Sequence, residues 1–171
     1  MDIRKEFQKF FTALTNAQII LAYENGPRPA LPYIMLHVDL ANPLPAHISR
    51  IQPDGKRNIH AYRNARLQLQ CYGPGSWEIM EALSMAIHTE AANTLASAKN
   101  IAINGQAQLQ NIPVLRSATQ YEPRAVLDID AAYTGAITET VDYFDEVHGI
   151  SDFSLKNTPQ DPQPFMAKTE Y

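Results

Sequence analysis

The sequence predicts an α+β fold: a mostly antiparallel β-sheet packed against two α-helices, with a long β-hairpin and an extended C-terminal tail. Two helical hydrophobic patterns separate several strand-like patterns, and the order is helix, strands, long helix, strands. The chain of 171 residues is 45% hydrophobic and 19% charged, which is typical of one globular domain. We therefore expect a single α+β domain over residues 1–150, followed by an extended or disordered tail over residues 151–171.

The first elements follow from side-chain spacing. Apolar residues recur every three or four positions at the N-terminus and predict a helix: Ile3, Phe7, Phe10, Phe11 and Leu14. The apolar run 19–23 predicts a strand that ends at the Gly- and Pro-containing residues 25–29. Residues 32–40 predict the next strand, whose aliphatic even-numbered side chains are expected to face the core.

A long, exposed hairpin is predicted over residues 46–66. Pro43 and Pro45 interrupt the pattern before it, and Pro53-Asp54-Gly55 is a strong turn signal at its tip. The strand that follows, residues 66–73, alternates cleanly, with Leu67, Leu69 and Cys71 expected inside.

The second helix is expected to begin with Ser76 as its cap and to run to about residue 98. The pattern also allows a break in this helix near Thr89. Its predicted buried stripe consists of Ile79, Met80, Leu83, Ala86, Ile87, Ala91 and Leu95. After it, Asn104-Gly105 predicts a tight turn, and residues 108–119 predict one or two short strands. Residues 125–131 alternate again, with Leu127 and Ile129 inside and Asp128 and Asp130 outside.

Charge and composition exclude several classes of function. Fourteen Lys and Arg against 18 Asp and Glu give a net charge of −4, which disfavours bulk attraction to nucleic acid. One cysteine excludes an internal disulfide and a four-cysteine zinc site. We see no run of about 18 apolar residues and no signal-peptide pattern, so we expect a soluble cytosolic protein with no membrane span.

The candidate reactive groups favour structural roles. His37 and Asp39 share one strand face, but a solvated polar pair is favoured over a metal site. Cys71 is expected in the core because the sequence offers it no neighbouring base. The turn Gly73-Pro74-Gly75-Ser76 lacks a phosphate-binding signature. No catalytic constellation stands out and no metal site is predicted, so a structural or assembly protein is the leading class.

A series of short elements runs along the chain: Pro32-Tyr33 at the start of a strand, the outward glutamines Gln68 and Gln70 with Tyr72-Gly73 before the long helix, and Tyr121-Glu122-Pro123-Arg124-Ala125-Val126-Leu127-Asp128. Together these elements resemble the neck or tail terminator proteins of tailed bacteriophages. The similarity covers roughly residues 5–147, and residues 151–171 lie outside it. The resemblance implies a small α+β domain that forms a hexameric ring in the virion, which is assembled in the host cytoplasm. It implies no enzyme activity and no cofactor. Such a ring caps the tail tube and joins it to the head connector and neck proteins, and DNA passes through its lumen without specific binding.

A subunit interface can be predicted from charge. In a head-to-tail ring each subunit must present two different surfaces. The basic residues Lys56, Arg57, Arg63 and Arg66 are expected to meet the acidic face around Asp128 and Asp130, or Asp142, Asp145 and Glu146, of the next subunit. The alternative function is a nucleic-acid-binding module that uses the basic hairpin around residues 56–66.

Overall fold

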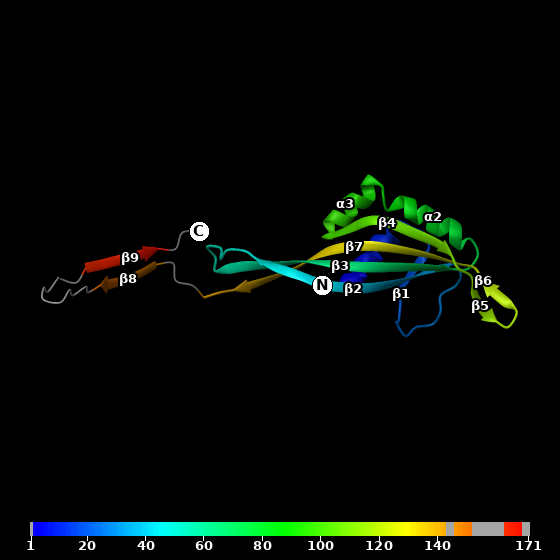
Figure 1. Cartoon of the computed structure of the whole chain (residues 1–171), viewed down its shortest axis with the longest axis horizontal. Coiled ribbons are helices and arrows are strands. Elements are labelled where there is room, and N and C mark those ends of the chain that lie inside the picture. Colours follow the sequence, from blue (N-terminus) through cyan, green and yellow to red (C-terminus); the bar gives the residue numbers. More distant parts are fainter. Residues whose placement is uncertain (1, 143–145, 152–162, 169–171) are drawn as a thin grey trace. The chain divides into compact units, whose positions relative to one another are not determined.

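The computed structural model describes residues 2–142, 146–151 and 163–168 (Figure 1). Its elements are α1 (Ile3–Thr12), β1 (Gln18–Leu21), β2 (Tyr33–Ile48), β3 (Lys56–Tyr72), α2 (Ser76–Ala86), α3 (Glu90–Ala98), β4 (Ile101–Asn111), β5 (Val114–Ser117), β6 (Gln120–Glu122), β7 (Arg124–Thr140), β8 (Glu146–Ser151) and β9 (Gln163–Lys168). This confirms the predicted α+β class. None of the described helices is long and apolar enough to cross a membrane.

Five strands form the main sheet in the order β1-β2-β3-β7-β4. β1 runs parallel to β2, with Gln18 opposite Tyr33, whereas β4 runs antiparallel to β7, with Leu109 opposite Leu127. Only residues 49–55 connect β2 to β3, and so short a connection requires these neighbouring strands to be antiparallel. The pairs β5-β6 and β8-β9 form two separate, antiparallel two-stranded sheets.

The chain divides into two compact units. The first comprises Met1–Pro45 and Ala61–Gly135, and it holds the helices and most of the main sheet. The second comprises Ala46–His60 and Ala136–Tyr171, which includes the turn between β2 and β3 and the β8-β9 pair. The predicted domain boundary at residue 150 stays a prediction.

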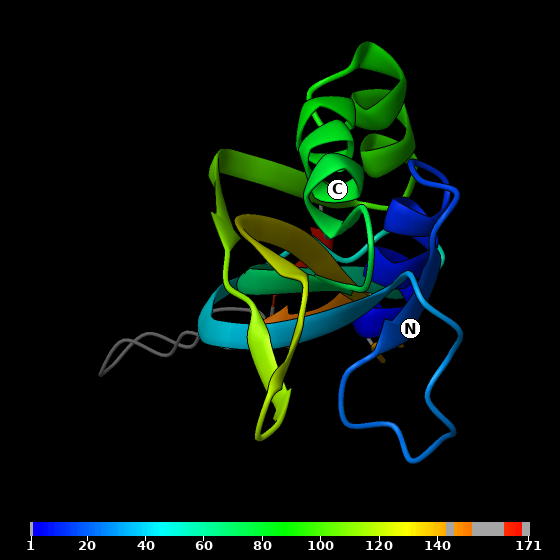
Figure 2. The same ribbon diagram turned by 90° about the vertical axis from the view of Figure 1, so that its right-hand side faces the viewer.

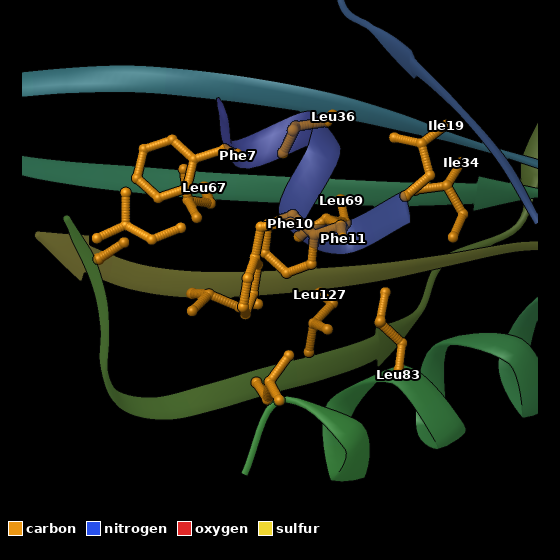
Figure 3. Close-up of a cluster of buried hydrophobic side chains, with 14 of the residues drawn as sticks. Phe7, Phe10, Phe11, Ile19, Ile34, Leu36, Leu67, Leu69, Leu83 and Leu127 are labelled. Carbon is orange, nitrogen blue, oxygen red and sulfur yellow. The ribbon is translucent and has the colours of Figure 1, made fainter. Parts of the chain in front are cut away.

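The core of the first unit lies between one face of the sheet and the helices. Figure 3 shows Phe10 and Phe11 of α1 beside Leu69 and Leu127 of the strands, with Leu83 of α2 close by. On β3 and β7 the side chains predicted to face inward are buried, as expected from their alternation: Leu67, Leu69, Cys71, Leu127 and Ile129. On β2, Ile34 and Leu36 are buried and Val38 is half-buried, whereas the side chain of Leu40 lies outside the described part of the chain. In α1, Asp2 caps the helix by accepting a hydrogen bond from the backbone nitrogen of Arg4.

The second predicted helix is two helices, and this shifts its buried stripe. α2 ends at Ala86, and Thr89 starts α3 as its N-cap, accepting from the backbone nitrogen of Ala92 at 3.2 Å. The restart changes the helical phase, so Ala91, predicted to be buried, is exposed, while Ala92 and Ala96 are buried. The prediction that Ser76 caps the helix is wrong: Gly75 is the N-cap, in a left-handed conformation, and Ser76 is the first, buried residue of the helix.

At two places where the sequence predicts an interruption of regular structure, the strand is continuous. The pattern break at Pro43 and Pro45 lies within β2, which runs on to Ile48. Asn104-Gly105 forms no hairpin turn: it lies inside β4, where the register against β7 shifts between Asn104 and Gln108. The shift in register lets the strand continue through a dipeptide that, in isolation, favours a turn.

The predicted tail lies largely outside the described residues. Its described part includes β9, which pairs antiparallel with β8 from Glu146 opposite Lys168 to Ser151 opposite Gln163. The prediction of an extended or disordered tail over residues 151–171 named no paired strand, and for the residues outside the described ranges it stays a prediction.

Candidate functional site

The face of the main sheet opposite the helices carries a row of linked polar side chains, which we call the polar ladder. Gln68 donates a hydrogen bond to Asp128 at 2.9 Å, and Gln70 donates to Gln68 at 2.6 Å. Tyr72 and Arg124 both donate to the side-chain oxygen of Gln70, at 2.7 and 3.3 Å. All five side chains are half-buried. The ladder satisfies these groups within the chain and joins β3 to β7 across the outer face.

The ladder ends at an aromatic clamp formed by Arg28, Tyr33, Tyr72 and Glu122. The rings of Tyr33 and Tyr72 stack with centroids 5.3 Å apart. The Arg28 guanidinium lies 5.4 Å from the Tyr33 ring centroid and 5.8 Å from that of Tyr72, donates to the Tyr33 hydroxyl oxygen at 3.0 Å, and forms an ion pair with Glu122. Partial burial acts to lower the pKa of Arg28, but the hydrogen bonds to Tyr33 and Glu122 outweigh it and raise the pKa above its usual value.

The clamp gathers the sequence elements that carry the family resemblance. Tyr33, Tyr72 and Glu122 come from three separate segments of the chain, and Gly73 donates its backbone hydrogen bond to Pro123 at 3.0 Å. Gly73 has a φ of 104°, and a Cβ there would lie 2.9 Å from the Cβ of Leu31, so the turn requires glycine. These contacts fix the β5-β6 hairpin and the segment before β2 to the end of β3.

The clamp depends on a residue that the sequence analysis passed over. Arg28 lies between Pro27 and Pro29 in a segment read only as a breaker of regular structure. A single arginine held between two prolines is a weak signal of a fixed cation. Its partner, Glu122, lies 94 residues away, which no local pattern reveals.

The predicted interface residues have contacts within the chain. In the first unit, Arg66 pairs with Asp130 at 3.5 Å, with both side chains exposed, and Arg63 donates to the backbone oxygen of Tyr62. Asp128 belongs to the polar ladder. The structure therefore brings Arg66 and Asp130 together within one subunit, where we had expected such residues to meet between subunits.

The remaining basic residues of the prediction lie in the second unit. Lys56 pairs with Asp54 at 3.2 Å, and Arg57 forms an ion pair with Glu139. Asn58 accepts from the Thr138 hydroxyl at 2.7 Å, which ties the same strands together. Of the alternative acidic residues, Asp142 is exposed, Asp145 lies outside the described residues, and only the backbone of Glu146 is described.

His37 and Asp39 form a polar pair on the outer face, as predicted. Their side chains are 3.0 Å apart, and the Tyr23 ring lies edge-on to His37 with centroids 5.2 Å apart. Among the described residues, no three His, Cys, Asp or Glu side chains are grouped so that they could hold a metal ion. His37 is half-buried and Asp39 is exposed, so the pair lies on a partly solvated surface.

Cys71 packs in the core, as predicted. It is fully buried, and this burial raises the pKa of its thiol to about 11. At neutral pH the side chain is therefore a thiol, which is a poor nucleophile.

Comparison with known proteins identifies a family. The sequence model of a family described as Phage neck terminator protein matches residues 1–154, which covers the clamp, the polar ladder and all the described helices. No curated protein matches the chain significantly. With so much of its length matched, the chain belongs to the phage neck terminator protein family and is a structural protein of the phage virion.

Proposed function

We propose that this protein forms a hexameric ring at the head–tail neck, where it caps the tail tube and joins it to the head connector proteins. The family match over residues 1–154 is the observation that carries this proposal. In this role the protein acts through contacts with other virion proteins and needs neither a catalytic step nor a cofactor.

The ion pairs beside the polar ladder and in the clamp are suited to the lining of a channel through which DNA passes without specific binding. Arg66 faces Asp130, and Arg28 faces Glu122, so the fields of these cations are partly cancelled by carboxylates of the same chain. Phosphate binding depends on cations that can replace counterions along the DNA backbone. With a net charge of −4, the chain has no overall electrostatic attraction to a duplex, and a duplex that is not held slides freely.

The charge interface predicted from the sequence remains part of the proposal, but it requires an exchange of partners. Arg57 would have to leave Glu139, and Arg66 would have to leave Asp130, before either could pair with a neighbouring subunit. An exchange of one exposed ion pair for another changes the free energy little, by roughly 0–1 kcal/mol. We therefore expect these residues to set the register of neighbours more than their affinity.

The ring is tested by native mass spectrometry and electron microscopy of the purified protein, alone and mixed with isolated phage tails. We expect a species of six times the chain mass and a ring at the end of the tail tube. A protein that stays monomeric at high concentration and adds no density to tails would contradict the proposal.

The alternative, nucleic-acid binding by residues 56–66, makes a different prediction. It requires a gel shift of duplex DNA at low salt that weakens with a slope of roughly −0.9 per neutralised phosphate. Since Lys56, Arg57 and Arg66 all have carboxylate partners, we expect no such shift.

A further inference from the structure

The β5-β6 hairpin presents apolar side chains to solvent. Leu115 and Tyr121 face each other across the two strands and are 55% and 72% exposed. Arg116, next to Leu115, is exposed and has no ion-pair partner among the described residues. Figure 2 shows this hairpin, in lime green, projecting away from the helices. We call these three residues the knob.

A groove that is lined by apolar side chains and one carboxylate lies between the end of α1, the start of β1 and α2. It has a volume of about 620 Å³, and its apolar lining is Leu14, Ala17, Pro32, Ile79, Ala82 and Leu83. Glu78 also lines it and is exposed, without an ion-pair partner in the described part of the chain. The groove thus joins an apolar floor to an unpaired carboxylate.

We propose that the knob of one subunit seats in the groove of the next, with Leu115 and Tyr121 on its apolar floor and Arg116 paired with Glu78. This inference rests on the proposed ring and names the contact that would close it. The two surfaces are different parts of one chain, and this is the requirement for head-to-tail closure. Tyrosine and arginine are also enriched among the residues that contribute most to binding energy at protein interfaces.

A second copy of this chain is the occupant that the charges favour. Arg66 and Lys9, two other exposed cations of this unit, have carboxylates beside them, whereas Arg116 has no ion pair in the described part of the chain. In the groove, Glu78 would supply a carboxylate to Arg116. The apolar side chains of the groove would cover Leu115 and Tyr121, so the two surfaces are complementary.

The test is a charge-swap cycle scored by the dissociation constant of the ring, measured by native mass spectrometry over a concentration series. We expect Arg116→Glu and Glu78→Lys each to raise this constant at least about tenfold, because each places like charges together. The double variant, Arg116→Glu with Glu78→Lys, should restore assembly. Glu81→Lys makes the same charge change on α2 outside the groove and should assemble normally.

Thermal unfolding separates assembly from helix stability. Glu78 lies in the first turn of α2, where a carboxylate also stabilises the helix, so Glu78→Lys lowers the melting temperature of the subunit. The double variant keeps this lower melting temperature while it regains assembly. Assembly that is lost in proportion to melting temperature, with no rescue in the double variant, would overturn the knob-and-groove contact.

The apolar half of the contact is tested by Tyr121→Ser. The side chain is largely exposed in the subunit, so the fold should be unaffected while ring formation falls at least about tenfold. Wild-type rings together with normal assembly of Tyr121→Ser and both charge variants would reject this contact and leave the ring intact. Absence of wild-type rings, both alone and on tails, would instead reject the proposed function.

Discussion

The two faces of the main sheet share the same strands but are held in different ways. On β3, Leu67, Leu69 and Cys71 are completely buried against the helices, whereas Gln68 and Gln70 between them lie half-exposed in the polar ladder. Apolar burial contributes in proportion to the area removed from water, while a solvent-accessible hydrogen bond mostly replaces a bond to water. We therefore expect substitutions on the covered face to cost much more stability than substitutions on the open face.

The largest effect is expected from Leu69→Asp. It places an unpaired carboxylate at a fully buried position, and we expect a loss of at least about 4 kcal/mol of the roughly 5–15 kcal/mol that stabilises a domain. Circular dichroism should show an unfolded or aggregated chain. Leu69→Met, which nearly preserves volume, is the control and should cost less than about 1.5 kcal/mol. A folded Leu69→Asp protein would mean that this face is not the core.

A smaller effect is expected at the clamp, where the open face is partly covered. Arg28→Ala leaves the buried Glu122 carboxylate without its cation and should cost about 1–3 kcal/mol in urea unfolding. Arg4→Ala removes an arginine from an exposed pair and should cost under about 1 kcal/mol. Equal costs for the two variants would show that the clamp is only a surface contact.

The polar ladder should tolerate substitution. Gln68→Ala removes the donor to Asp128 and the acceptor for Gln70, but water can reach both partners, so we expect a cost of about 1 kcal/mol or less. The matched variant on the covered face, Leu69→Ala, should cost about 2–5 kcal/mol. The two are compared by their midpoints of urea unfolding, and a larger cost for Gln68→Ala would reverse the contrast between the faces.

The smallest effect is a dependence of stability on pH at the edge of the covered face. Hydrogen bonds from Lys9 and Lys99 to Glu6 lower the pKa of this carboxyl below its usual 4.5. The unfolded chain therefore binds the proton more readily, so the stabilisation is present above pH 4.5 and is lost as pH falls through the lower folded value. Glu6→Gln should flatten this part of the acid unfolding profile, and an unchanged profile would contradict the prediction.

Much of this architecture could be predicted because it depends on local periodicity. The faces of β3 and β7 follow from alternation around Leu69 and Leu127, and α1 follows from the spacing of Phe7, Phe10 and Phe11. Predictions were wrong where a short motif is compatible with two different local structures. Asn104-Gly105 suits a turn but is accommodated in β4 by a register shift, and Ser76 suits a cap but is buried after Gly75.

The sequence by itself determined the fold class, the direction in which the core-forming strand residues point, and the resemblance to phage neck proteins, because each depends on residues near one another in the chain or on a series of short motifs. Only the tertiary structure decided which charges are already paired. Arg28 meets Glu122 and Arg57 meets Glu139 across 94 and 82 residues of chain. Ion pairs form by proximity in space, and strand order sets that proximity, so a basic stretch in the sequence does not reveal which of its charges remain available to a neighbour.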